Sequence, residues 1–242
     1  MPVSQPSPQV LTGGQPAPAL SGSLPLPQPW RLPPRGLAVF HGEGDVARLS
    51  HYFLPRLLTE GKRVLFLDGA NSADPRLLER FARERHVPFE RFNRGIQIAR
   101  AFTCFQLTEL IARVPQFLRD FPAEVVIVTA FPDLYFDEDV HDWNARVAFE
   151  QGLGNLRRWC HGAAGLSRHD GGVKPPLHAA PSVIIAVFSA ASTFAPSPAR
   201  RRFFAQLCAA ASEVWRFSVD ADNRLRLTCT QQAMKKIDSL TH

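Results

Sequence analysis

From Arg35 onward, short apolar runs of strand length alternate with segments whose apolar residues recur every three or four positions. Residues 124–130 (EVVIVTA) and 182–189 (SVIIAVFS) are almost continuously apolar and β-branched, as expected for strands covered on both faces. Strands that alternate with helices are typical of βα units, whose strands lie parallel in one sheet. The sequence therefore predicts an α/β fold with a doubly wound, mostly parallel sheet flanked by helices.

The same patterns place the other elements. Further strands are expected at 36–40, 63–67 and 96–99. Helices are expected at 46–58, from Pro75 onward behind an Asp74 N-cap, around 107–118 and at about 140–159. Pro55 should kink or shorten the first helix. Residues 214–219 and 224–229 alternate apolar and polar positions across a turn, which predicts an antiparallel hairpin at the sheet edge.

Proline marks a different region at the start of the chain. Of the 21 prolines, 10 lie between Pro2 and Pro34, where Arg31 is the one charged residue. Such a composition cannot bury enough apolar surface to offset the entropy of ordering it. We therefore expect a disordered, Pro-rich tail over 1–34, a folded domain over 35–242 and, within it, a loop rich in Gly, His and Pro over 162–181.

Cysteine and apolar patterns predict the compartment. The four cysteines are far apart and form no CxxC pair, which suits buried thiols in a reducing cytoplasm. The N-terminus shows no signal-peptide pattern, and the apolar runs are too short to cross a bilayer, so we expect a cytoplasmic protein without a membrane partner. The spacings among Cys160, His161, His169 and His178 match no standard zinc pattern, so no metal site is expected.

Charge is distributed unevenly along the chain. Residues 35–156 carry 15 basic and 17 acidic side chains, whereas residues 157–242 carry 12 basic and 5 acidic ones. A polyanion would therefore be attracted mainly to the C-terminal third. The acidic run from Asp133 to Asp142 is expected to form a solvated loop.

The turn after the first strand is the usual phosphate site of such a sheet. It begins at Gly42, and a P-loop counted from there would place Gly, Lys and Ser or Thr at Ala47, Arg48 and Leu49. The frame is present, but the hydroxyl that holds magnesium is missing and arginine replaces the lysine. The sequence thus predicts a degenerate nucleotide-binding turn formed by Gly42, Glu43, Gly44, Ala47, Arg48 and Leu49.

Together with the segments that follow, this turn resembles the core of the RecA/RadA family of recombinase ATPases. The matching segments, in the family's order over roughly 36–230, are Leu65-Phe66-Leu67-Asp68, Asp74-Pro75-Arg76-Leu77-Leu78, Ala99-Arg100-Ala101-Phe102 with Gln106, and Val125-Val126-Ile127-Val128. The family's catalytic glutamate falls near Ala70 and its Walker B aspartate falls on Thr129. The resemblance therefore implies a RecA-like sheet with little or no ATP hydrolysis.

The resemblance also implies sites beyond the turn. Asp68 ends the second strand and is expected on the acidic rim of the nucleotide site. Two loops of the family contact single-stranded DNA, and their counterparts here are 135–142, which is acidic, and 190–202, which ends in Arg200, Arg201 and Arg202. These arginines are the candidate DNA contacts, with a solvated helix start as the alternative. From their helical or strand-end positions, Phe102, Phe105, Trp143 and Trp159 are expected to lie in the core, with a role as stacking platforms as the alternative.

The function implied is that of a RecA-like accessory protein of DNA recombination or repair, catalytically degenerate and not expected to be an efficient enzyme. It would bind a partner recombinase, a repair polymerase, single-stranded DNA or further copies of itself through RecA-type packing, with ATP bound but not efficiently hydrolysed. A nucleotide-binding regulator or slow ATPase that does not act on DNA is the alternative. A protein-interaction module that binds neither ligand is a third hypothesis.

Overall fold

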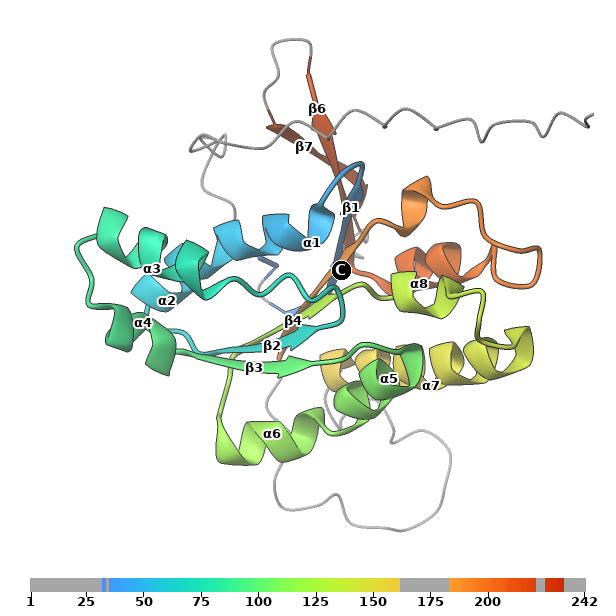
Figure 1. The fold of residues 1–242 in the computed structure, drawn as a ribbon, viewed down its shortest axis with the longest axis horizontal. Helices are drawn as coiled ribbons and strands as arrows, with labels where there is room; N and C mark the ends of the chain where they lie inside the picture. The colour runs from blue at the N-terminus through green and yellow to red at the C-terminus, as the bar shows by residue number, and fades with distance from the viewer. Residues whose placement is uncertain (1–31, 34, 162–182, 221–224, 233–242) are drawn as a thin grey trace, which may run out of the picture.

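Helices cover both faces of a seven-stranded sheet in the computed structural model, which describes residues 32, 33, 35–161, 183–220 and 225–232 (Figure 1). The strand order is β3-β2-β4-β5-β1-β6-β7. The strands are β1 (Gly36–Gly42), β2 (Val64–Asp68), β3 (Ile96–Arg100), β4 (Val125–Thr129), β5 (Ile184–Ser189), β6 (Glu213–Val219) and β7 (Leu225–Gln232). All neighbours pair in parallel except β6 and β7, which confirms the predicted fold class and the C-terminal hairpin.

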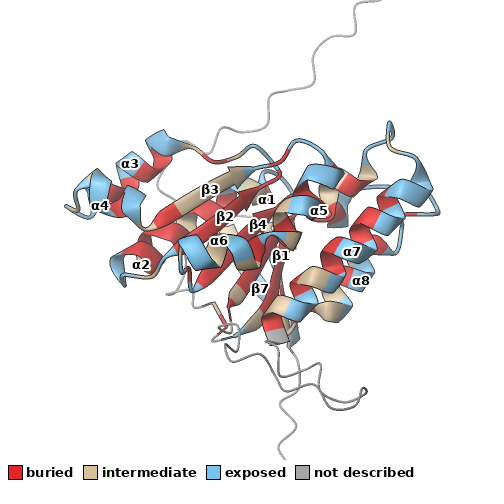
Figure 2. Cartoon of the chain, turned by 90° about the horizontal axis from the view of Figure 1, so that it is seen from below, coloured by how far each residue is buried: buried red, intermediate tan, exposed pale blue. Residues whose placement is uncertain are grey.

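The helices form two layers, one on each face of the sheet (Figure 1). One layer contains α1 (Val46–Leu49), α2 (Leu54–Thr59), α3 (Pro75–Glu84) and α4 (Phe89–Arg94). The other contains α5 (Cys104–Ala112), α6 (Val114–Asp120), α7 (Asp142–His161) and α8 (Phe203–Ala210). Because successive strand residues point to opposite faces, Val39 and Leu65 pack under the second layer, whereas Phe40 and Phe66 pack under the first. Figure 2 shows the strands buried and the outer helix faces exposed.

Prolines divide two of the expected helices. The segment predicted as one helix over 46–58 consists of α1, a 3₁₀ turn (Ser50–Phe53) and α2, which has Pro55 in its first turn. Pro55 lacks the N–H that would continue the helix ladder, so the α-helix restarts there. In the same way, Pro115 lies in the first turn of α6, and the helix expected around 107–118 becomes α5 and α6. The sequence analysis did not predict α4.

Several aromatic residues expected in the core lie on the surface instead. Phe102 is 64% exposed and Trp143 is 60% exposed, and Phe105 is also exposed; for these three the prediction was wrong. They occupy the β3–α5 connection and the first turns of α5 and α7, on the side that faces solvent. Trp159 is half-buried against the core and donates its indole N–H to the carbonyl oxygen of Ile111 at 3.3 Å.

The cysteines also divide between core and surface. Cys104 and Cys160 are buried as expected, Cys208 is half-buried, and Cys229 is exposed on β7. All four are free thiols. Burial raises the pKa of Cys160 to about 12, which keeps that thiol protonated and unreactive at neutral pH.

The boundaries of the packed region differ slightly from the expected ones. Leu32, assigned to the tail, is half-buried and packs against the core beneath α1–α4, and Pro33 is buried. The rest of the predicted tail, with the loop predicted over 162–181, lies outside the described residues. Of the helices in the described part of the chain, none has the length and apolar character needed to cross a membrane.

Candidate functional site

The turn between β1 and α1 lies where the sequence predicts, but its own oxygen atoms occupy its backbone donors. Asp45 is the N-cap of α1, and its carboxylate accepts the Arg48 N–H at 3.1 Å. The N–H of Val46 bonds to the Gly44 carbonyl oxygen at 3.0 Å, and that of Leu49 bonds to the Asp45 carbonyl oxygen at 3.3 Å. A phosphate-binding turn directs such N–H groups at the ligand. Here a carboxylate of the turn itself takes the place of the anion.

Arg48 and Leu49, which the sequence analysis matched to the lysine and hydroxyl of a P-loop, both interact with other parts of the protein. Arg48 is exposed and lies 3.8 Å from the Asp74 carboxylate at the start of α3. Leu49 is buried in the core beneath α1–α4. The arginine therefore interacts with a neighbouring element, and the position that would hold magnesium contributes to apolar packing.

Gly42 is needed for packing against the neighbouring strand. A Cβ at this position would lie 2.4 Å from the carbonyl oxygen of Phe217 on β6, and φ is +158°. Gly44 has φ +79°, but a Cβ there would meet nothing within 4 Å. The glycine that begins the degenerate motif thus allows β1 and β6 to approach, whereas Gly44 allows the turn its left-handed conformation.

We expect Gly42→Ala to lower the free energy of unfolding by about 2–3 kcal/mol, because the new methyl group must displace the β6 backbone. Gly44→Ala, which adds backbone strain without a clash, should cost only about 1 kcal/mol. Urea denaturation of both variants beside the parent protein measures the difference. Equal losses would contradict the packing role assigned to Gly42.

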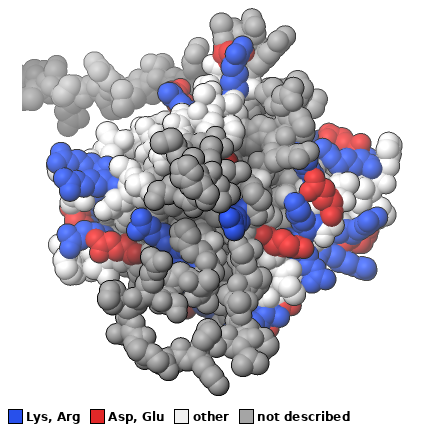
Figure 3. Space-filling model, turned by 180° about the vertical axis from the view of Figure 1, so that it is seen from behind, with Lys and Arg blue, Asp and Glu red and all other residues white. Residues whose placement is uncertain are grey.

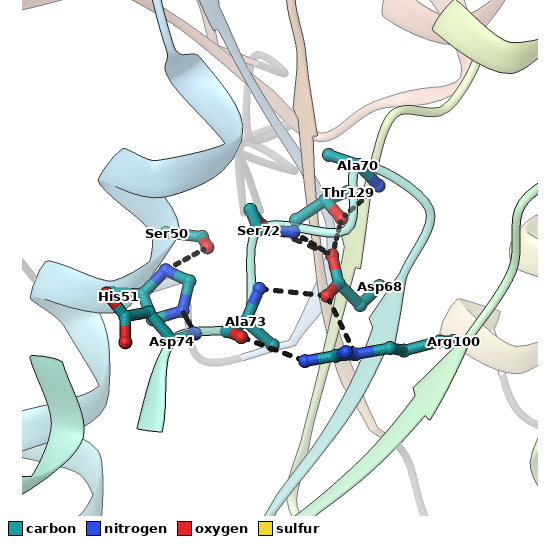
Figure 4. Close-up of polar contacts among 9 residues, drawn as sticks. All are labelled: Ser50, His51, Asp68, Ala70, Ser72, Ala73, Asp74, Arg100 and Thr129. Atoms are coloured by element: carbon teal, nitrogen blue, oxygen red, sulfur yellow. Dashed lines mark hydrogen bonds and ion pairs between the residues drawn. The ribbon is translucent and has the colours of Figure 1, made fainter. Parts of the chain in front are cut away.

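The carboxyl edge of β2 carries a buried polar cluster centred on Asp68 (Figure 4). The Asp68 carboxylate accepts hydrogen bonds from the N–H of Ser72 (2.9 Å), the N–H of Ala73 (2.8 Å) and the hydroxyl groups of Ser72 and Thr129. Arg100 at the end of β3 lies 3.7 Å away and donates to the Ala73 carbonyl oxygen at 2.9 Å. Asp68 therefore holds the β2–α3 loop in place.

This cluster corrects the expectation that Asp68 lies on an acidic rim. Asp68 ends its strand as predicted, but it is fully buried and both carboxylate oxygens are engaged by protein donors. Thr129, on which the resemblance places the Walker B aspartate, donates to Asp68 at 3.1 Å and accepts the Ala70 N–H at 3.2 Å. Because buried charges are stabilised only when such partners surround them, this geometry fits a structural anion and not a magnesium or water ligand.

His51 connects the degenerate turn to the β2–α3 loop. Its ring is buried, with Nδ1 3.2 Å from the Arg48 carbonyl oxygen and Nε2 3.3 Å from the Asp74 backbone N–H. These partners fit a neutral ring that donates from Nδ1 and accepts at Nε2. Burial lowers the pKa of His51 below its usual value. The hydrogen bond from the Asp74 N–H thus requires the neutral form of the His51 imidazole, because a protonated ring could not accept it.

Acidification should weaken the fold through His51. Because its folded-state pKa is lower than its unfolded value, the unfolded chain binds the proton more readily, and the stabilisation is lost as pH falls below about 6.5. The parent protein should have a higher free energy of unfolding than His51→Gln at pH 7.5. This difference should shrink as the pH falls to 5.5, by at most about 1.4 kcal/mol per pH unit. Urea titrations across this range measure it. A difference that does not change with pH would show that His51 does not titrate on unfolding.

The loops after β4 and β5 pack together, and Arg200 is the main link between them. Its Nε donates to the Asp142 carboxylate at 2.6 Å, Nη1 donates to the carbonyl oxygens of Tyr135 (3.1 Å) and Asp137 (2.6 Å), and Nη2 donates to that of Val140. The Arg200 side chain is only 5% exposed. The structure therefore corrects the expectation that Arg200 contacts DNA, because its three nitrogen atoms all donate to protein acceptors.

Arg201 and Arg202 differ from their neighbour. Both are exposed just before α8, whereas Phe203 is buried and Phe204 is half-buried. The DNA-contact prediction stays open for these two arginines alone. Figure 3 views the molecule from behind, and the face that it draws has basic and acidic side chains interspersed. Part of the basic surplus expected in the C-terminal third, including Arg168 and Lys174, lies outside the described residues.

The acidic run that follows β4 is only partly solvated. Asp137, Glu138 and Asp139 are exposed as predicted. Asp133, however, accepts hydrogen bonds from the Ser189 hydroxyl (2.5 Å) and the Ala190 N–H (2.8 Å), and burial raises the pKa of its carboxyl group. Within the described residues, no group of three or more His, Cys, Asp or Glu side chains is placed to hold a metal ion.

Three features of this edge were not predicted from the sequence: the N-cap role of Asp45, the contacts of His51 and the burial of Arg200. For Asp45 a signal existed, since an aspartate directly before an apolar helical segment is a typical N-cap. His51 and Arg200 gave none, because their partners lie 23 and 58 residues away. No protein-family model and no curated protein matches the chain. The site must therefore be interpreted from its own chemistry.

Proposed function

We propose that this protein is a catalytically degenerate, RecA-like accessory protein of DNA recombination or repair that acts by binding partner proteins, single-stranded DNA or both. The RecA-like assignment rests on the sequence resemblance, together with the position of the turn between β1 and α1 and of Ala99-Arg100-Ala101-Phe102 at the end of β3. The geometry of the turn supports the proposal that hydrolysis is inefficient.

One observation carries the proposal: the Asp45 carboxylate caps α1 and accepts the Arg48 N–H, a donor that a phosphate-binding turn would direct at its ligand. Phosphoryl transfer depends on cations, magnesium ligands and a positioned water, all held around the phosphates. Here the P-loop arginine reaches Asp74, the hydroxyl position is a buried leucine, and Thr129 binds Asp68. With these groups engaged elsewhere, binding is the activity left to the fold.

Nucleotide turnover tests the catalytic half of the proposal. Purified protein with magnesium and ATP should release phosphate no faster than Arg48→Ala, because Arg48 does not face a phosphate site. A higher rate in the parent that falls to background in Arg48→Ala would instead support the alternative, a slow ATPase or nucleotide-binding regulator. Thermal stabilisation by ATP measures whether nucleotide binds without turnover.

The affinity for an oligo-dT strand at several salt concentrations tests the DNA half. If Arg201 and Arg202 contact phosphates, changing both to Gln should weaken binding. The plot of log affinity against log salt concentration should also become less steep, by about 0.7 for each phosphate contact that is lost. The control is Arg91→Gln with Arg94→Gln, two exposed arginines on α4. Binding that is lost equally in both double variants would indicate non-specific charge attraction. Absence of DNA binding in the parent would leave partner proteins as the ligand.

A further inference from the structure

A hollow of about 720 Å³ lies between the loops that follow β4 and β5, at the carboxyl end of the sheet. Its apolar lining consists of Leu134, Phe136, Phe194, Ala195 and Pro196. Phe194 is 44% exposed, and its ring meets that of Phe136 edge to face, with centroids 5.6 Å apart. The volume is large enough for a few side chains of a ligand.

The walls of this hollow are held by polar contacts between and within its loops. Arg200 binds the first loop at Tyr135, Asp137, Val140 and Asp142. On the other side, Asp133 holds the start of the second loop through Ser189 and Ala190. A ligand would therefore enter a preformed space and would not have to order two free loops, which reduces the entropic cost of binding.

The charge of the lining selects the kind of ligand. Four carboxylates line the hollow, those of Asp133, Asp137, Glu138 and Asp142, against the single guanidinium of Arg200. Arg200 already binds Asp142, and Asp133 is held by neutral donors. Asp137 and Glu138 are exposed and pair with no basic side chain of the described residues. A cationic segment would gain from these two charges, and a polyanion would be repelled.

We propose that this hollow binds a basic peptide segment of a partner protein, with an apolar side chain against Phe136 and Phe194 and a Lys or Arg beside Asp137 and Glu138. The inference rests on the proposed function in one respect, namely that the protein acts by binding, and it specifies the chemistry of the partner. The hollow would bind the peptide, whereas DNA would have to bind at the exposed Arg201 and Arg202 before α8.

Two short fluorescent peptides test the proposal with the full-length protein. Both contain a Leu-Phe-Leu centre, flanked in one by lysines and in the other by glutamates. At near-physiological salt, fluorescence polarisation should show at least about tenfold tighter binding of the lysine-flanked peptide. Glu138→Lys and Phe194→Ser should each weaken that binding about tenfold, because one reverses the charge and the other removes the apolar contact.

Two matched variants control for non-specific electrostatic attraction and for non-specific hydrophobic binding of the peptide. Glu90→Lys reverses an exposed charge on α4, and Phe102→Ser removes an exposed aromatic ring outside the hollow. Both should bind like the parent. The proposal is overturned if the lysine-flanked peptide fails to bind, if Glu90→Lys weakens binding as much as Glu138→Lys, or if oligo-dT displaces the peptide. None of these outcomes depends on ATP turnover, so a failed catalytic test and a failed peptide test remain distinguishable.

Discussion

Replacement of Arg200 by Leu should lower the free energy of unfolding by about 3–5 kcal/mol, one of the two largest losses that we expect from a single substitution in this protein. The guanidinium bonds three backbone carbonyl oxygens of the loop after β4 as well as the Asp142 carboxylate. Leu would leave these acceptors without their donor and would remove a charged side chain that is itself only 5% exposed. The cost is that of four lost charge-assisted hydrogen bonds and not of one ion pair.

The adjacent arginine offers a close control. Arg201→Leu removes the same charge one residue along the chain, but from an exposed side chain, so it should change stability by no more than about 0.5 kcal/mol. Guanidinium denaturation measures both variants. Hydrogen exchange should show faster opening of amides in residues 133–142 for Arg200→Leu, because this loop loses its anchor. If the two variants were equally stable, the role assigned to Arg200 would be wrong.

Local patterns were sufficient to predict the sheet. The β-branched runs that became β4 and β5 are buried along almost their whole length, as strands covered on both faces must be. The hairpin was predicted from alternating apolar and polar residues, but the two buried positions of β6, Val214 and Phe217, are three residues apart and pack into the cores on opposite faces of the sheet. The pattern therefore gave the pairing of β6 with β7 but not which positions of β6 are buried.

The polar contacts at the carboxyl end of the sheet could be predicted only in part, because they join segments that are far apart in the sequence. An arginine before two phenylalanines looks like a solvated charge, and only the packing of the β4 loop against the β5 loop buries Arg200. Asp68 ended a strand as expected, but the loop over Ser72 and Ala73 turns its N–H groups onto the carboxylate. A sequence shows that a charge lies at the edge of a sheet, but not which donors surround it.

Substitution of Asp68 by Ala should destabilise the protein by about 3–5 kcal/mol, and this result separates a structural anion from a catalytic one. The change removes the acceptor for two backbone N–H groups and two hydroxyl groups. It also removes the negative charge that lies 3.7 Å from the Arg100 guanidinium. Buried donors without acceptors are costly, and a charged acceptor contributes more than a neutral one. Asp68→Asn, which keeps one oxygen, should lose about half as much.

A carboxylate kept for metal binding or catalysis gives the opposite pattern, since functional sites are commonly strained and their removal often leaves the fold as stable or more so. Asp74→Ala serves as the reference, because it removes an N-cap side chain from the same loop and should cost about 1 kcal/mol. Urea denaturation at pH 7 ranks the three variants. If Asp68→Ala were no less stable than Asp74→Ala, the buried cluster would not hold the β2–α3 loop, and a ligand role for Asp68 would regain support. If Asp68→Ala is clearly the least stable, the carboxylate at the edge of β2 is part of the architecture that holds the β2–α3 loop.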